Sequence, residues 1–333
     1  MMFSQISVIG AGGWGTALAS LLAADGTPVR LWAHGPDTAE ELQRERTNSV
    51  FLPGVRIPDS VLPTADLADA AGADLLVLVA PSRAFREVSM RLVESGVRDG
   101  AVIVSCTKGI EHGTGALMTD ILEECIPGCR PAVLSGPNLA AEVVRGVPAA
   151  GVIGSKHGDV LPGLQQLFSR TTYRAYTSDD VAGIQLGGAL KNVFAIAAGV
   201  CDGLGMGSNA KAALVTRALA EMMRLGVAMG GRRETFSGLS GIGDLMVTCF
   251  SDLSRNHGFG ERLGRGESPE AIQASMKMVA EGVPTSRSAL ECARRLGVEA
   301  PITAQVHAVI YEGRSVREGM GELLDRPPKP EVG

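Results

Sequence analysis

The chain begins with a short apolar run followed at once by a glycine-rich turn. The run is Ile6–Ile9, and Gly10, Gly12 and Gly15 follow it in the spacing G-x-G-x-x-G. In such a turn the first glycine permits a tight bend and the second lets the backbone approach a pyrophosphate, while the third lets helix and strand pack closely. Free amides at the start of the helix attract the anion. The spacing predicts a dinucleotide-binding turn, and a purely structural turn is the alternative.

Up to about residue 180, apolar runs alternate with segments of helical spacing. The expected strands are Ile6–Ile9, Val29–Trp32, Leu75–Ala80, Ala101–Ser105 and Ala132–Leu134, and the expected helices are Thr16–Ala24, Pro36–Arg46, Ala84–Glu94 and Gly115–Glu124. Strands that are apolar throughout and alternate with helices indicate a parallel sheet covered on both faces. We therefore predict an α/β, doubly wound, Rossmann-like domain over residues 1–179.

The pattern changes near residue 180. Long stretches with helical spacing, such as Asp180–Val200 and Ala210–Met229, replace the strand runs, and Ser178 or Asp180 is placed to cap the first helix. We predict an all-α domain for substrate binding and dimerisation over residues 180–325. The Pro-rich tail, residues 326–333, is expected to be disordered.

Charge and cysteine usage exclude several classes of function. The net charge is −5, so the overall balance does not favour nucleic acid. The six cysteines lack the spacing of a metal site, which predicts reduced, mostly buried thiols and no metal. The first residues lack the basic region of a signal peptide, and no apolar stretch reaches the roughly 18 residues needed to cross a bilayer. We therefore expect a cytoplasmic protein without membrane insertion.

The end of the second predicted strand bears on the choice of cofactor. An NAD-preferring site usually carries Asp or Glu there, to hold the ribose 2′-hydroxyl. The first acid in this chain is Asp37, and His34 stands at the strand end instead. A histidine does not repel a 2′-phosphate, which favours NADP, or the use of both cofactors, over NAD alone. The alternative is that His34 is a solvent-facing loop residue.

Two polar segments follow predicted strands. Thr107–Gly109 comes after Ala101–Ser105, and Ser135–Asn138 comes after Ala132–Leu134. Ligands of open parallel sheets bind at the carboxyl ends of the strands, so we expect Lys108 to face the cofactor and an anionic substrate. The second segment suits a close backbone approach to a ligand. A solvated loop lysine and a simple turn are the alternatives.

Lys191 lies within a long apolar helix, just after Gly187 and Gly188. A charged side chain in such surroundings is costly, as are two helical glycines at roughly 1 kcal/mol each. Helical side chains lean back over the preceding turn, so we predict that the amine lies above a bare glycine surface open to a ligand. Close helix packing is the alternative for the glycines, but it does not explain the lysine. We predict that Lys191 is the acid–base group.

A fourth segment, residues 241–256, combines an acid with a helix start. Ser254 is placed to cap a helix that begins at Arg255. A helix N-terminus beside an arginine suits a phosphate. Asp244 is placed to hold Lys191 or to accept a substrate hydroxyl. The alternatives are a surface salt bridge for Arg255 and a turn or cap role for Asp244.

Taken together, these segments resemble the bacterial-type NAD(P)-dependent glycerol-3-phosphate dehydrogenase family, nearly end to end. The matching stretches are Gly10–Leu18, Asn48–Pro53, Thr107–Gly109, Ser135–Pro137, Gln185–Asn192, Gly207–Ala210, Gly243–Leu245 and Ser254–Asn256, with Val279, Glu281–Gly282 and Pro301–Ile302. The resemblance implies reversible hydride transfer between NAD(P)H and dihydroxyacetone phosphate, giving sn-glycerol 3-phosphate for glycerophospholipids. It also implies a homodimer.

The resemblance assigns roles to individual residues. Those implied to line the dinucleotide site, besides the three glycines of the turn, are Gly13, Trp14, His34, Phe51, Ala140, Val279 and Glu281, with Lys108 and Arg255 nearby. Those implied to hold the substrate are Lys108, Gly136, Asn138, Asp244, Ser254, Arg255 and Asn256, with Lys191 as proton donor and acceptor. The family commonly has Thr or Ser at the position of Asn138 and Phe at that of Leu139, so this chain departs from it there.

The residues leave two rival functions open. Dehydrogenases of the 6-phosphogluconate and 3-hydroxyisobutyrate group also join a Rossmann domain to a helical domain with a catalytic lysine. Asp244 and Ser254–Asn256 separate this chain from that group. A non-catalytic dinucleotide sensor explains the glycine turn but not Lys191. For an enzyme, burial and the charge of Lys108 are expected to lower the pKa of Lys191, and Asp244 is expected to oppose them.

Overall fold

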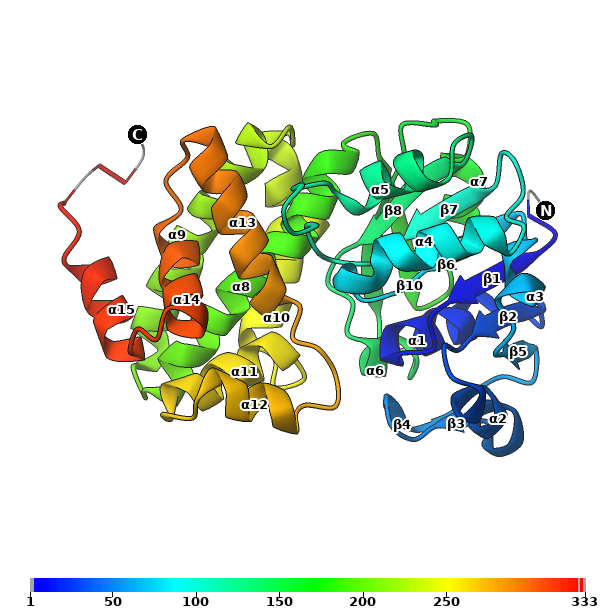
Figure 1. Ribbon diagram of the computed structural model, residues 1–333, viewed down its shortest axis with the longest axis horizontal. Helices are drawn as coiled ribbons and strands as arrows, with labels where there is room; N and C mark the ends of the chain where they lie inside the picture. The colour runs from blue at the N-terminus through cyan, green and yellow to red at the C-terminus, as the bar shows by residue number, and fades with distance from the viewer. Residues whose placement is uncertain (1–2, 329, 332–333) are drawn as a thin grey trace.

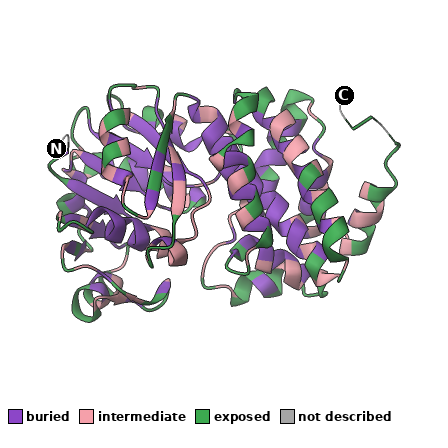
Figure 2. Ribbon diagram, turned by 180° about the vertical axis from the view of Figure 1, so that it is seen from behind, coloured by how far each residue is buried: buried purple, intermediate pink, exposed green. Residues whose placement is uncertain are grey.

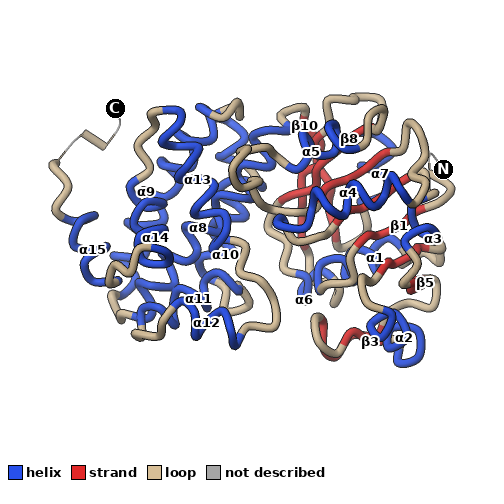
Figure 3. The backbone as a smooth tube through the Cα atoms, in the orientation of Figure 1, coloured by secondary structure: helices blue, strands red, loops and turns tan. Residues whose placement is uncertain are grey.

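The computed structural model describes residues 3–328 and 330–331. The two halves of the chain lie side by side, and the described strands all fall in the N-terminal half (Figures 1 and 3). The C-terminal half consists of helices and loops. This is the predicted combination of a Rossmann-like sheet with a helical domain. The exact division at residues 179 and 180 stays a prediction.

The N-terminal half is built on one eight-stranded sheet. From edge to edge its strands are β10 (Tyr173–Ser178), β9 (Ala149–Gly154), β8 (Arg130–Ser135), β7 (Val102–Ser105), β6 (Leu75–Leu78), β1 (Ile6–Ile9), β2 (Val29–Trp32) and β5 (Val61–Thr64). The six strands from β8 to β5 are mutually parallel. By contrast, β9 pairs antiparallel with β8, and β10 pairs parallel with β9, so both run in the opposite direction. The sheet is thus not parallel throughout. Only the four-residue helix α6 (Ala140–Val143) lies between β8 and β9, whereas the crossover between parallel strands is usually made by a longer α-helix.

Helices cover both faces of this sheet, as a doubly wound fold requires. Val8 of β1 packs on the face covered by α1 (Gly13–Leu22) and α7 (Leu161–Phe168). The next residue, Ile9, packs on the opposite face. That face carries α3 (Leu67–Ala71), α4 (Phe85–Glu94) and α5 (Met118–Cys125). A small excursion from the β2 edge contains α2 (Pro36–Glu45) and the strand pair β3 (Thr47–Asn48) and β4 (Leu52–Arg56).

The C-terminal half is organised around one long helix, α8 (Val181–Gly203). The elements that follow are α9 (Gly207–Ala228), α10 (Asp244–Phe250), α11 (Arg255–Gly264), α12 (Pro269–Ser275), α13 (Gly282–Leu296), α14 (Pro301–Tyr311) and α15 (Val316–Leu324), with the short helices η2 (Arg233–Ser237) and η3 (Leu239–Gly243) before α10. Five of these helices, α9, α10, α11, α13 and α14, pack on α8, which is therefore buried nearly all round (Figure 2). By length and composition α8 could span a membrane, but 89% of its most apolar window is buried within the protein.

The predicted cap and the local elements are confirmed. Asp180 caps α8 by accepting a hydrogen bond from the amide of Gly183 at 3.0 Å. All five predicted strands and all four helices predicted between them coincide with observed elements to within a few residues. All six cysteines are free and five are buried, as expected. In the tail, Arg326 pairs with Glu299, and residues 329 and 332–333 lie outside the described residues, so its disorder stays a prediction.

Candidate active site

The glycine turn between β1 and α1 has the geometry that a dinucleotide phosphate needs. Gly10 has φ +117°, and a Cβ there would lie 2.9 Å from the carbonyl oxygen of Val79. A Cβ on Gly15 would lie 1.8 Å from the carbonyl oxygen of Gly10, so helix and turn pack too closely for any side chain. In contrast, a Cβ on Gly12 would have no protein atom within 4 Å. The backbone at Gly12 is therefore open to a ligand, and the residues fit a pyrophosphate.

The side chain of Asn48 holds this turn in place through hydrogen bonds. Its buried amide donates to the carbonyl oxygen of Ala11 at 2.9 Å and to Thr16 Oγ1 at 2.8 Å, and its oxygen accepts from the amide of Phe51 at 3.1 Å. Phe51 in turn lies against Gly13, where a Cβ would be 2.6 Å from the Phe51 carbonyl oxygen. Phe51 thus borders the turn, as the resemblance implied, and Asn48 positions both.

Two lysines meet one carboxylate where the sheet joins the helices. Lys191 Nζ on α8 lies 2.6 Å from Asp244 Oδ1 and donates to Thr248 Oγ1 at 2.5 Å. Lys108 Nζ, on the loop after β7, lies 2.5 Å from Asp244 Oδ2 and donates to the Gly136 carbonyl oxygen at 3.1 Å. Asp244 is fully buried and Lys191 is 7% exposed. The carboxylate therefore holds the two amines in one place.

Burial controls the proton on Lys191. Desolvation lowers the pKa of Lys191 to about 8, the charge of Lys108 lowers it too, and Asp244 opposes both by Coulomb attraction. The directions match those expected from the sequence. An amine with this pKa is present in both protonation states close to neutral pH, so it can donate and accept a proton in the same cycle.

The expected bare surface under Lys191 is wrong. A Cβ on Gly187 would lie 2.4 Å from the Ser240 carbonyl oxygen in η3. A Cβ on Gly188 would lie 2.6 Å from Ser135 Oγ and 3.4 Å from Lys108 Cγ. The glycines are therefore explained by close packing, which was the alternative. Their absent side chains let η3, and with it Asp244, as well as the stem of Lys108, approach Lys191.

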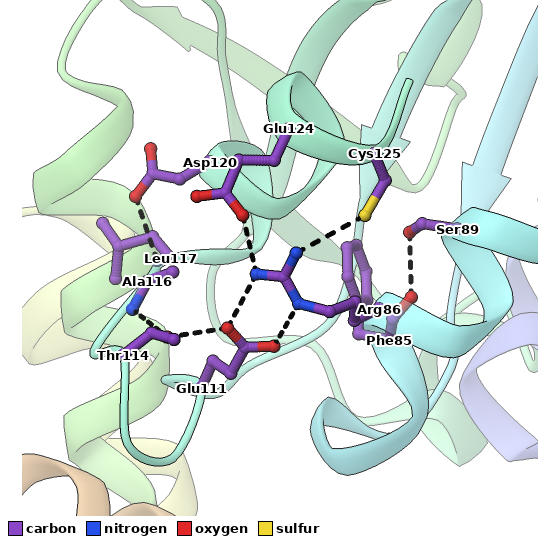
Figure 4. A network of polar contacts seen from close by, with 10 residues as sticks. All are labelled: Phe85, Arg86, Ser89, Glu111, Thr114, Ala116, Leu117, Asp120, Glu124 and Cys125. Carbon is purple, nitrogen blue, oxygen red and sulfur yellow. Dashed lines mark hydrogen bonds and ion pairs between the residues drawn. The ribbon is translucent and has the colours of Figure 1, made fainter. Parts of the chain in front are cut away.

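An ion-pair network holds the loop that carries Lys108 (Figure 4). Arg86 of α4 donates to both oxygens of Glu111 at 2.8 Å and to Glu124 of α5 at 2.7 Å. Thr114 Oγ1 donates to Glu111 at 2.6 Å. At the start of the same loop, Thr107 Oγ1 donates to the Ala80 carbonyl oxygen at 2.7 Å. The loop is fixed at both ends to the sheet half, which positions Lys108.

The start of α11 contacts Asn192, the residue that follows Lys191 on α8. Ser254 caps the helix, as predicted, by accepting a hydrogen bond from the amide of His257 at 3.2 Å. Asn256 Nδ2 donates to Asn192 Oδ1, next to Lys191, at 2.9 Å, and its oxygen accepts from the Gly282 amide at 2.8 Å. The side-chain amide of Asn256 therefore links α11, on which it lies, to α8 and α13.

Arg255 is exposed at this helix start and donates to the Val279 carbonyl oxygen at 2.9 Å. A cavity of about 400 Å³ opens beside it, lined in part by Ser254, Arg255 and Arg262. An apolar cavity of about 390 Å³ lies elsewhere, among α8, α9, α14 and α15, and Lys191 does not line it. Of the two, only the first adjoins predicted site residues.

Glu281 connects the two halves of the molecule. Its carboxylate accepts from the Ser82 amide at 3.2 Å and from Ser82 Oγ at 2.5 Å, and Ser82 follows β6 of the sheet. Burial raises the pKa of this carboxyl, and the two Ser82 hydrogen bonds oppose the rise. Glu281 thus borders the edge of the sheet that carries the glycine turn.

The remaining predicted residues lie around the same edge. Gly136 has φ +139°, and a Cβ there would be 3.0 Å from the Ala150 carbonyl oxygen. With its nitrogen turned toward acceptors, Asn138 lies 3.2 Å from both the Ala150 carbonyl oxygen and Tyr173 Oη, so its contacts are within the sheet half. Ala140 begins α6, Trp14 lies in the first turn of α1, and His34 is exposed at the end of β2.

Both halves of the chain match one known protein family. The family described as "NAD-dependent glycerol-3-phosphate dehydrogenase" matches the chain twice, with its N-terminal part at residues 5–160 and its C-terminal part at residues 180–321. The chain belongs to this family. The resemblance inferred from the sequence is confirmed.

Individual members of the family match over nearly the whole chain. Proteins named glycerol-3-phosphate dehydrogenase [NAD(P)+] from Syntrophotalea carbinolica and Nitratidesulfovibrio vulgaris are 46% and 47% identical, covering 98% and 97% of this chain and 99% and 98% of their own lengths. The crystal structure of glycerol-3-phosphate dehydrogenase from Coxiella burnetii superposes with a TM-score of 0.94 at 37% identity, covering 98% of this chain and 100% of that one.

In this dehydrogenase the fold gathers most of the predicted residues, but several contributors were missed. Thr248, Asn192, Asn48 and Ser82 received no role from the sequence. Thr248 stands four residues after Asp244, which places both on one helix face, and Asn192 adjoins Lys191. Those spacings could have pointed to the first two. Nothing local marks Ser82, because its partner Glu281 is 199 residues away. Asn48 has a local partner in Phe51, but its contact with the glycine turn, at Ala11, spans 37 residues.

Proposed function

We propose that this protein is an NAD(P)-dependent sn-glycerol-3-phosphate dehydrogenase, which interconverts dihydroxyacetone phosphate and sn-glycerol 3-phosphate. The observation that carries the proposal is the buried pair of lysines on one carboxylate. Lys191, held 2.6 Å from Asp244, has a pKa of about 8 and lies beside the second cation, Lys108. This is an acid–base group with an adjacent positive charge for an anionic substrate.

The chemistry divides between the cofactor and the chain. The nicotinamide cofactor supplies the hydride for reduction and takes it in oxidation. During reduction, protonated Lys191 donates to the oxygen on C2 of dihydroxyacetone phosphate and stabilises the negative charge that develops there. During oxidation, neutral Lys191 accepts the hydroxyl proton of sn-glycerol 3-phosphate. Asp244 and Thr248 fix the position of the amine in both directions.

The phosphate of the substrate has a separate anchor. We propose that Arg255, Asn256 and the first amides of α11 hold it, because a helix start, a guanidinium and a cavity of about 400 Å³ occur together there. Lys108 adds a second positive charge beside Lys191. Binding energy gained at the phosphate then orients C2 for reaction. The other site residues implied by the resemblance are proposed in the same roles.

Cofactor choice, assembly and location are part of the proposal. The end of β2 carries His34 and no acid, which favours NADP or dual use over NAD alone. We also propose a cytoplasmic homodimer that supplies sn-glycerol 3-phosphate for glycerophospholipids. The resemblance to the family and the composition of the chain support these points.

Steady-state kinetics tests the function directly. Oxidation of NADPH and NADH is followed with dihydroxyacetone phosphate, and unphosphorylated dihydroxyacetone serves as the matched control. We expect turnover with the phosphorylated ketone and a loss of at least roughly 100-fold in kcat/KM without the phosphate. Preferential oxidation of 3-hydroxyisobutyrate or 6-phosphogluconate would favour the rival dehydrogenases, and binding of dinucleotide without any turnover would favour a sensor.

A further inference from the structure

The end of β2 lacks the acid that recognises an unphosphorylated ribose. The four residues after Trp32 are Ala33, His34, Gly35 and Pro36. The next carboxylate, Asp37, is exposed in the first turn of α2. In Rossmann-type sites this strand end lies beside the adenosine ribose, so the groups gathered here decide whether a 2′-hydroxyl or a 2′-phosphate is bound.

A guanidinium from another element reaches this strand end. Arg91 stands on α4, and its terminal nitrogen lies 3.3 Å from His34 Nδ1. Its central carbon lies 5.3 Å from the centroid of the Trp32 ring, as in a cation–π contact. The indole is itself fixed, because it is 3% exposed and its nitrogen donates to the Ala65 carbonyl oxygen at 3.1 Å. The guanidinium of Arg91 is therefore positioned by its contact with a fixed aromatic ring.

The charge of Arg91 is not neutralised by a neighbouring acid. Across residues 3–328 and 330–331, no carboxylate forms an ion pair with it. Arg86, five residues earlier on the same helix, is bound by both Glu111 and Glu124. A preformed guanidinium without an acid partner is the group that a phosphate monoester binds best, through two parallel hydrogen bonds.

His34 completes the arrangement. Arginine has no hydrogen-bond acceptor, so His34 Nδ1 accepts from Arg91 in this contact and Nε2 carries the ring hydrogen. The Nε2–H group of an exposed side chain is then available to a ligand. Two donors, one of them charged, thus face the same strand end.

We propose that Arg91, together with His34, binds the 2′-phosphate of NADP(H), and that Arg91 is the residue that sets the preference for the phosphorylated cofactor. The inference rests on the proposed function only in requiring that a dinucleotide binds at this end of the sheet. Sequence spacing could not reveal it, because Arg91 lies on α4, 57 residues from His34, which follows β2.

Binding of two adenosine fragments by the full-length protein tests this inference. The probes are 2′,5′-ADP, which carries the 2′-phosphate, and 5′-AMP, which lacks it, and affinity is measured by titration calorimetry. We expect the unmodified protein to bind 2′,5′-ADP more tightly. Arg91→Met should weaken 2′,5′-ADP by about 10- to 100-fold, as for a lost hydrogen bond to a charged group, and leave 5′-AMP within about twofold. The ratio of kcat/KM for NADPH to that for NADH should fall by a similar factor.

Arg174→Met is the matched control. Arg174 stacks on Tyr176 at 5.2 Å in β10, at the opposite edge of the sheet, so it loses the same kind of cation–π contact far from β2. Equal weakening of both fragments by Arg91→Met, or no change in either, would overturn the proposal. The fragments contain no nicotinamide, so their binding does not depend on turnover. Failure of the dehydrogenase assay alone would therefore reject the proposed reaction and not this inference.

Discussion

At the scale of single residues, the chemistry depends on Lys191. Its amine is the group placed to exchange a proton at C2, so Lys191→Met should lower kcat by roughly 10²–10⁴-fold in both directions. Lys211→Met is a matched control, because Lys211 is also a buried lysine on a helix, paired at 2.5 Å with Asp202. It should cost stability without a comparable loss of kcat. Stopped-flow and steady-state rates on folded protein test this prediction. Similar kcat values for the two variants would show that Lys191 is not the acid–base group.

The same amine predicts a pH dependence whose sign can be tested. Oxidation needs neutral Lys191, so kcat/KM for sn-glycerol 3-phosphate should rise with pH and level off above about 8. Reduction needs the protonated amine and should fall over the same range. Profiles of both directions, measured on one preparation, check the prediction. Parallel profiles would show that another group titrates.

The neighbours of Lys191 should move that midpoint in opposite directions. Asp244 raises the pKa of Lys191, so Asp244→Asn should shift the oxidative midpoint downward, whereas Lys108 lowers it, so Lys108→Met should shift the midpoint upward. Shifts of roughly one pH unit or more are expected for charges in direct contact. The midpoint, and not the rate, is the quantity to compare, because both variants also weaken substrate binding. Shifts of the same sign would contradict the electrostatic assignment.

At the scale of elements, the site depends on how closely α8 approaches its neighbours. Gly187→Ala puts a Cβ 2.4 Å from the Ser240 carbonyl oxygen, so η3 must move and carry Asp244 away from Lys191. We expect a loss of about 1–3 kcal/mol in the free energy of unfolding, together with a fall in kcat. Gly321→Ala, where α15 leaves open space, should instead stabilise by about 0.5–1 kcal/mol at unchanged kcat. Denaturant unfolding and kinetics of both variants test this pair, and a stable, active Gly187→Ala protein would contradict it.

The element scale also shows what the sequence could predict. The glycine turn, the Asp180 cap and the start of α11 were predictable because each depends on residues within a few positions of one another. The meeting of Lys108 with Asp244 spans 136 residues, so spacing could only suggest it. The strand β9 was missed because Ala149–Gly154 contains two glycines and few branched side chains, and its reversed direction depends on a loop. The glycines of α8 were misread because their packing partners are distant in the sequence. Ser240 of η3 lies about fifty residues after Gly187, and Ser135 and Lys108 lie about fifty and about eighty residues before Gly188.

At the scale of the whole molecule, α8 belongs to both halves. Near the start of α8, Ile184 packs with Val181 and with Val133 of the sheet. Further along, α8 forms the centre of the hydrophobic core of the C-terminal half. Glu281 and Ser82 join the halves a second time. A site assembled across such a junction requires that the halves stay together, because Lys108 comes from one and Lys191 from the other.

We therefore expect the two halves to unfold as one cooperative unit. Both tryptophans, Trp14 and Trp32, lie in the sheet half, so their fluorescence reports on that half, whereas helical circular dichroism at 222 nm is dominated by the other. The two denaturation curves should coincide for the unmodified protein. Ile184→Ala removes a fully buried contact at the junction and should cost about 2–5 kcal/mol, enough to separate the curves. Leu324→Ser, at a side chain 72% exposed, should leave them together. Separate transitions in the unmodified protein would mean that α8 does not couple the halves, and the site would then have to be assembled by the cofactor itself.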